Sequence, residues 1–144
     1  MKFLLDTNVL SELIRLRPDS NVTAWFDVVD EDATFISVIS IAEMRRGASL
    51  LDRSSKRHAI ENWLHDEIVT RFGTRTLDVT PQIANAWGGI MADAKRRRIG
   101  LETMDCFIAA SAQVHSLAIA TRNERDFKSL NIPLINPWLP LSLS

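Results

Sequence analysis

The chain opens on Phe3-Leu4-Leu5-Asp6-Thr7-Asn8-Val9-Leu10, in which three apolar residues stop at a carboxylate. An unbroken apolar run of this length predicts a buried parallel strand, because a half-exposed strand would alternate apolar and polar residues. Thr7 or Asn8 can cap the following helix, whose apolar positions recur with a helical period: Val9, Leu10, Leu13 and Ile14. A carboxylate that ends a buried strand and is not needed as a cap is costly unless something satisfies it. Asp6 is therefore a candidate functional residue.

The same alternation of short apolar runs and helical patterns continues along the chain. Further strands are predicted at 34–36, 76–79, 117–120 and 134–135, and further helices at 22–29, 37–51, 54–72, 81–98 and 103–115. Thr80-Pro81 supplies an N-cap with proline at the first helical position, Ala84 lies on the inward face of that helix, and Gly100 is its expected stop. This order predicts a three-layer α/β/α fold with a central parallel sheet of four to five strands and right-handed crossovers. No repeat or linker divides the sequence, so residues 1–144 are expected to form a single domain.

Composition narrows the class of protein. The chain has 144 residues, 46% hydrophobic and 24% charged, with a single cysteine. Cys106 alone cannot form a disulfide framework or a cysteine-rich zinc site and favours a reducing compartment. Seventeen basic against eighteen acidic residues give a formal charge of -1, so any attraction to nucleic acid must be local. No run of about 20 apolar residues is present. We expect a soluble, cytoplasmic protein without a membrane partner.

Four acids are candidate site residues: Asp6, Glu43, Asp105 and Asp126. In open parallel sheets, ligands bind outside the carboxyl ends of the strands, and Asp6 and Asp126 follow the first and fourth predicted strands. Asp105 is in the first turn of the preceding helix, and Glu43 stands among apolar residues. Each of the last three also has a structural interpretation: Ser40 and Glu43 match a capping box, Asn123 and Asp126 a weaker one, and Asp105 complements a helix dipole.

Carboxylates that converge on one pocket repel each other, and divalent cations between them relieve that repulsion. Oxygen ligands select Mg²⁺ or Mn²⁺ over Zn²⁺, and the sequence offers no paired His or Cys alternative. Such ions activate water and stabilise phosphoryl transfer. The residues alone predict a metal-binding acidic pocket, with phosphodiester hydrolysis as one plausible use.

The order of four motifs is similar to that of a known family. The motifs are Phe3-Leu4-Leu5-Asp6-Thr7-Asn8-Val9-Leu10, Ser37-Val38-Ile39-Ser40-Ile41-Ala42-Glu43, Asp105-Cys106-Phe107-Ile108-Ala109-Ala110-Ser111-Ala112, and Ala120-Thr121-Arg122-Asn123 with Asp126-Phe127. In this order and spacing the chain resembles the PIN-domain family and, within it, the toxins of VapBC-type toxin–antitoxin modules, including the FitB-like branch. The motifs span nearly the whole chain.

The resemblance implies a magnesium-dependent endoribonuclease, the toxin of a type II toxin–antitoxin system, with RNA as substrate. Carried across, Asp6, Glu43 and Asp105 match the acidic core of the family and Asp126 its fourth acid, although Asn123 stands where some members carry that acid. Thr7, Asn8 and Thr121 would line the pocket and orient water or phosphate. The resemblance also implies a homodimer and a cognate antitoxin that inserts into the active-site groove.

Cations near the acids are candidates for holding a polyanionic substrate. They are Arg45, Arg46, the run Arg96 to Arg98, and Arg122 beside the expected pocket. For Arg96 to Arg98 the alternative is a solvated helix end that complements the dipole. Trp138, flanked by Pro137 and Pro140, packs on the domain or marks an interface.

Two other functions remain open on the residues. A phosphotransferase of the haloacid-dehalogenase type also places an acid after its first strand, but its Asp-x-Asp signature differs from Asp6-Thr7-Asn8 here. The other is a non-catalytic PIN-like or receiver-like module that binds Mg²⁺. A metal-dependent nuclease assay distinguishes it from the enzyme.

Overall fold

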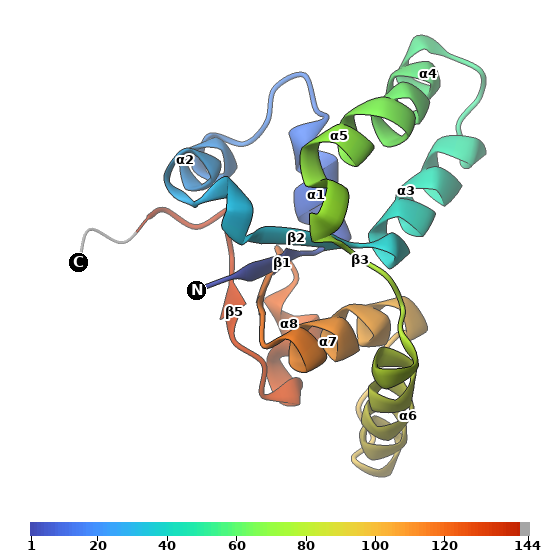
Figure 1. Ribbon diagram of the computed structural model, residues 1–144, viewed down its shortest axis with the longest axis vertical. Helices are drawn as coiled ribbons and strands as arrows, with labels where there is room; N and C mark the ends of the chain where they lie inside the picture. Colours follow the sequence, from blue (N-terminus) through green and yellow to red (C-terminus); the bar gives the residue numbers. More distant parts are fainter. Residues whose placement is uncertain (142–144) are drawn as a thin grey trace.

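A computed structural model describes residues 1–141 and shows a parallel sheet of five strands with helices on both faces (Figure 1). The strand order is β3-β2-β1-β4-β5, and every neighbouring pair is parallel. The strands are β1 Phe3–Leu5, β2 Thr34–Ser37, β3 Thr76–Leu77, β4 Ala118–Ala120 and β5 Leu134–Ile135. The predicted α/β class and its parallel sheet are confirmed.

The helices form two layers on opposite faces of the sheet (Figure 1). One layer holds α1 Thr7–Leu13, α2 Ser20–Val28, α3 Val38–Leu50, α4 Ser55–Asn62 and α5 Ile68–Phe72, with a π-helical turn Trp63–Glu67 between the last two. The other holds α6 Pro81–Arg96, α7 Thr103–His115 and α8 Glu124–Phe127. Single 3-10 turns occur at Glu31–Ala33, Gly73–Arg75 and Lys128–Leu130. Among the described residues, none of these helices has the length and apolar character that crossing a bilayer demands.

Strands β1, β2, β4 and β5 contribute to both hydrophobic cores, because successive side chains point to opposite faces of the sheet. Phe3 and Leu5 pack with Trp25 and Phe72 in the core beneath α1 to α5. Leu4 packs with α7 and α8 in the other core, against side chains such as Ile108, Ile119 and Phe127. Both faces of β1 are therefore covered, which explains its unbroken apolar sequence.

The register brings the ends of β1, β4 and β5 to one edge. Leu5 pairs with Ala120 and Ala120 with Ile135. The backbone N–H of Asp6 then donates to the carbonyl of Ala120 at 2.9 Å, and that of Thr121 to the carbonyl of Ile135 at 2.9 Å. Residues that follow the strands thus meet at the carboxyl edge of the sheet.

Two predicted N-terminal caps are wrong. Asp6 itself caps α1 by accepting from the backbone N–H of Thr7, a role predicted for Thr7 or Asn8. Ser37 caps α3 and accepts from the N–H of Ile39, so Ser40 lies inside the helix and forms no capping box with Glu43. The start of the helix predicted over 37–51 agrees with the structure, and only the alternative interpretation of Ser40 and Glu43 as a capping box fails. Thr80 caps α6 as predicted.

The end of α6 also differs from the prediction. Arg98, not Gly100, adopts the left-handed conformation, with φ of 57°. Its N–H donates to the carbonyl of Lys95, and that of Ile99 to Ala94, which together close the helix in a Schellman motif. Ala84, predicted to face inward, is exposed. The neighbouring Ile83, in the same turn of α6, is fully buried, so the packed face of the helix passes through Ile83 and leaves Ala84 at the surface.

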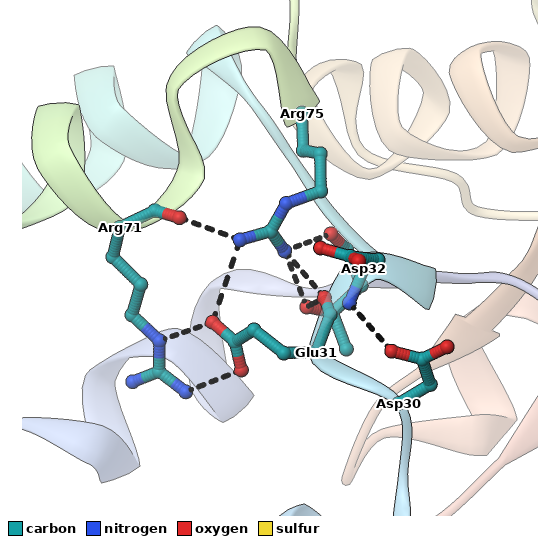
Figure 2. A network of polar contacts seen from close by, with 6 residues as sticks. Asp30, Glu31, Asp32, Arg71 and Arg75 are labelled. Carbon is teal, nitrogen blue, oxygen red and sulfur yellow. Dashed lines mark hydrogen bonds and ion pairs between the residues drawn. The ribbon is translucent and has the colours of Figure 1, made fainter.

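A network of ion pairs fastens the entry to β2 (Figure 2). Glu31 accepts two hydrogen bonds from Arg71, at 2.7 and 3.1 Å, and a longer one from Arg75. The Arg75 guanidinium also donates to the carbonyl and hydroxyl of Thr34, the first residue of β2. The rings of Phe26 and Phe72 lie against the Arg71 guanidinium at 5.7 and 5.4 Å. The network therefore connects the end of α5 to the start of β2.

Candidate functional site

The carboxyl edge of the sheet is hollowed by a cavity of about 510 Å³. Its walls come from α1, α3, the start of α7 and the segment that leads into α8. The lining residues are mostly polar: Asp6, Thr7, Asn8, Ser11, Glu43, Gly100, Leu101, Glu102, Asp105, Asn123 and Asp126. The structure thus brings together all four acids that the sequence singled out.

Asp6 is held firmly at the floor of the cavity, with only 5% of its surface exposed. Its Oδ1 accepts from the N–H of Thr7 at 2.8 Å. Its Oδ2 accepts from the Thr121 hydroxyl at 2.8 Å and from the Asn8 side-chain amide at 3.3 Å. The Asp6 carboxylate therefore both caps α1 and belongs to the candidate site. Three hydrogen-bond donors fix its orientation.

Glu43 reaches the cavity from α3, on the neighbouring side. Its Oε1 accepts from the Thr7 hydroxyl at 2.7 Å, and Thr7 Oγ1 also lies 2.9 Å from the buried Ser40 hydroxyl. Ser40 and Glu43 are one helical turn apart, so both face Thr7. Thr7 consequently connects the second acid to the helix that the first acid caps.

The electrostatics of the cavity are those of mutually repelling acids. Burial, together with the nearby negative charges of Asp6, Asp126, Glu102 and Glu43, raises the pKa of Asp105 to about 7. Burial also raises the pKa of Asp6, although its hydrogen bonds from Thr121 and Thr7 act in the opposite direction. Within residues 1–141, none of the four acids forms a salt bridge with a basic side chain. The protein therefore leaves this negative charge unbalanced.

The donor set suits a hard cation that keeps part of its water shell. Over the described part of the chain, no three His, Cys, Asp or Glu side chains are arranged to enclose a metal ion on their own. Mg²⁺ takes one or two carboxylates and retains several waters, so a full protein cage is not required. The oxygen donors and the unbalanced charge of this cavity fit such an ion.

Thr121, which was expected to line the pocket, and Arg122, which was expected beside it, are both absent from the cavity lining. Thr121 is fully buried beneath Asp6, where it acts as a hydrogen-bond donor rather than a pocket surface. The guanidinium of Arg122 lies over the ring of Trp138, 5.3 Å from its centroid. The backbone of Arg122 remains close to the site, because its N–H donates to Asn8 Oδ1 at 3.2 Å.

Two of the arginines proposed to hold phosphate have partners on the protein. Arg45 pairs with Glu61 at 3.4 Å. Arg97 pairs with Asp93 at 3.2 Å and donates to the carbonyl of Ser129 at 3.3 Å. These contacts hold the two guanidinium groups against neighbouring groups on the protein surface.

Sequence reasoning missed part of the cavity wall. Ser11, Gly100, Leu101 and Glu102 line it as well. Glu102 occupies the N-cap position of α7 but makes no side-chain capping bond. A signal for it was present, since Glu102 precedes the candidate Asp105 by three residues, the spacing of one helical turn.

Comparison with protein families gives an independent result. The model of the PIN domain matches residues 3–132. The chain belongs to the PIN-domain family. Membership places all four sequence motifs in one family and excludes the phosphotransferase alternative.

Several proteins of known class within the PIN-domain family are similar to this chain over nearly its whole length. Toxin FitB of Neisseria gonorrhoeae is 35% identical, over 94% of this chain and 97% of its own. VapC ribonuclease Y4jK of Sinorhizobium fredii is 33% identical, over 95% and 98%. The solved FitAB complex bound to an IR36 DNA fragment matches with a TM-score of 0.88 and 32% identity, covering 99% of both chains. The FitAcB structure from Neisseria gonorrhoeae matches with a TM-score of 0.86 and 34% identity, covering 94% and 98%.

These relatives confirm the predicted family and enzyme class. This member of the PIN-domain family is a VapC- and FitB-like ribonuclease toxin of a toxin–antitoxin system. The nucleases of this family are typically metal-dependent.

Proposed function

We propose that residues 1–144 form a single nuclease domain that hydrolyses RNA phosphodiester bonds internally and depends on Mg²⁺. The observation that carries this proposal is the cavity at the carboxyl edge of the sheet, where Asp6, Glu43, Asp105 and Asp126 lie together without a basic partner in the described chain. Bringing several carboxylates together around the buried Asp6 is costly because they repel each other, so their convergence favours a bound cation over a structural role.

Asp6, Glu43 and Asp105 would hold the ion, with Asp126 completing the site; one or two of these carboxylates would contact it directly and the others would bind it through the waters it retains. Mn²⁺ offers the same preference for oxygen ligands and is the expected substitute. When bound, the ion supplies an activated water and offsets the charge that develops on the phosphate. Asn123 lies at the edge of the same cavity and is a candidate for orienting the substrate, together with Thr7 and Asn8.

Polar side chains next to the acids orient the Asp6 and Glu43 carboxylates. Thr121 and Asn8 direct Asp6 Oδ2, and Thr7 directs Glu43 Oε1. Each of these donors neutralises part of a carboxylate without adding a formal positive charge. The hydrogen bonds therefore fix the acids in place while leaving their negative charge available to a cation.

The partners we propose are an RNA substrate, a cognate antitoxin that closes the acidic groove, and a second copy of the chain. Support for the antitoxin comes from relatives: the FitAB complex and a DNA-bound VapBC complex from Salmonella typhimurium, the latter 26% identical with a TM-score of 0.76. The homodimer follows from the family resemblance.

Cleavage of a fluorescent RNA by purified protein tests the proposal. We expect cleavage in Mg²⁺, its loss in EDTA, and its return when Mg²⁺ or Mn²⁺ is restored. Asp6→Asn should fold like the wild type and lose cleavage, whereas Asp27→Asn, at an exposed acid on α2, should cleave normally. A wild-type protein that binds Mg²⁺ but leaves RNA intact would instead be the non-catalytic module, and full activity of Asp6→Asn would refute the assigned site.

A further inference from the structure

The loop that follows β4 controls the orientation of the buried acid. Thr121 donates to Asp6 Oδ2 at 2.8 Å, and the N–H of Asn123 donates to Thr121 Oγ1 at 3.0 Å. The N–H of Arg122 donates to Asn8 Oδ1 at 3.2 Å, while the Asn8 amide donates to Asp6 Oδ2 at 3.3 Å. Both routes from residues 121–123 therefore end on the same carboxylate oxygen.

The C-terminal segment 135–138 contacts the loop 121–123 at two successive residues, Thr121 and Arg122. The carbonyl of Ile135 in β5 accepts from the N–H of Thr121 at 2.9 Å. One residue further along the loop, the guanidinium of Arg122 lies over the indole ring of Trp138, 5.3 Å from its centroid. The first contact is a backbone bond that any residue could make, whereas the second depends on these two side chains.

Trp138 is fixed well enough to serve as a platform. Its carbonyl accepts from the Asn21 side chain in α2 at 2.8 Å, and its N–H donates to Asn136 Oδ1 at 2.9 Å. The side chain packs, partly buried, against the hydrophobic core beneath α1 to α5. Two hydrogen bonds therefore fix the backbone of Trp138 and core packing fixes its ring, so a cation that rests on the ring is held in place as well.

We propose that Arg122 and Trp138 are positioning residues of the nuclease site: their stacked side chains hold residues 121–123 so that Thr121 and Asn8 orient Asp6. The inference rests on the proposed ribonuclease function and assigns Arg122 a role other than binding phosphate. The Arg122 side chain does not line the cavity. Its guanidinium is stabilised by electrostatic attraction to the face of the indole ring, which favours the stacked position over a freely solvated one.

Steady-state cleavage kinetics test the pair. Arg122→Ala and Trp138→Ala should each lower kcat by about twofold to fivefold with little change in KM, since they remove one cation–π contact. Trp138→Phe should restore most of kcat because its ring still accepts the guanidinium. The double variant should be no worse than either single variant, as expected for two residues that act through one contact.

The matched control removes a comparable contact at the opposite end of the sheet. Lys2 lies over the Phe35 ring at 5.8 Å, just before β1. Lys2→Ala should leave kcat unchanged. Wild-type kcat in Trp138→Ala would overturn the proposal. It would also be overturned if Arg122→Ala raised KM and flattened the salt dependence of RNA binding, because those are the signs of a phosphate contact.

Hydrogen exchange in metal-free protein separates this inference from the ribonuclease proposal. The amides of Arg122 and Asn123 should exchange faster in Trp138→Ala than in the wild type, with no change for Lys2→Ala. This measurement needs neither RNA nor metal, so it stays informative if the wild type cleaves nothing. Unchanged protection of both amides would contradict the positioning role.

Discussion

The acidic cavity and the Glu31 network use the same kind of side chain in opposite ways. Glu31 accepts hydrogen bonds from Arg71 and Arg75, and its pairing with Arg71, followed by the charges of both arginines, holds its pKa below the usual value (Figure 2). In the cavity, burial and neighbouring acids raise the pKa values of Asp6 and Asp105 instead. An acid that the protein balances itself serves the fold, whereas acids that it leaves unbalanced are available for a cation from solution.

The largest expected effect follows from removing one unbalanced charge. Asp105→Asn should lower RNA cleavage on the order of 10²–10³-fold, as loss of a main electrostatic contributor to a transition state does. In metal-free protein the same variant should unfold at the same temperature as the wild type or higher, because it removes repulsion. Calorimetry on both proteins in EDTA checks this, and a marked loss of stability would mean that Asp105 has a structural role.

In the network around Glu31 we expect a substitution to lower stability and leave RNA cleavage unchanged. Arg75→Ala should lower the free energy of unfolding by about 2 kcal/mol, because it leaves Glu31 and Thr34 short of a charged donor. The cleavage rate of the folded protein should not change. Chemical denaturation measures the loss, with the exposed Arg53→Ala as control. A large fall in kcat would erase the distinction between the two regions.

The fold was largely predictable because its signals are local. The run Phe3–Leu5, the caps at Thr80 and Pro81 and the limits of α7 follow from side-chain period and capping chemistry. Helix caps were less predictable where several polar residues stand in sequence. Asp6, Thr7 and Asn8 can all cap α1, and only the position of Thr121 beside Asp6 decides how the three are used.

The four acids could be predicted as candidates, and their convergence follows from the parallel order of the strands. The partners of the basic residues could not. Arg122 is adjacent in sequence to pocket residues, yet its side chain rests on Trp138, sixteen positions later. Glu102 was missed because a carboxylate at an N-cap position looks like an ordinary capping residue, and only the structure shows that it makes no such bond.

A smaller effect is expected when the repulsion between Glu102 and Asp105 is removed. Neutralising Glu102 should lower the pKa of Asp105 from its value of about 7, since the charge of Glu102 contributes to raising it. Carbon-detected NMR titration of the Asp105 carboxyl in metal-free Glu102→Gln measures the change. Glu124→Gln, outside the cavity lining, is the control. An Asp105 pKa that did not fall would remove Glu102 from the electrostatics of the site.

The smallest expected effect is the pH dependence of the stability that Glu31 contributes. The folded-state pKa of Glu31 lies below its ordinary value of 4.5, so its stabilisation is present above that pH and is lost as pH falls through the folded value. Because Glu31 is 47% exposed, solvent limits the gain to about 0.5 kcal/mol. The stability difference between wild type and Glu31→Gln should therefore shrink between pH 6 and pH 3. A constant difference would show that the ion pairs contribute nothing.

A calorimetric titration of Mg²⁺ into metal-free protein distinguishes the two regions directly. The wild type should bind the ion and unfold at a higher temperature when it is present. Asp6→Asn should show neither binding nor the rise in unfolding temperature, and Glu31→Gln should show both. Binding of Mg²⁺ by Asp6→Asn with the affinity of the wild type would contradict the conclusion that the unbalanced acids form the metal site.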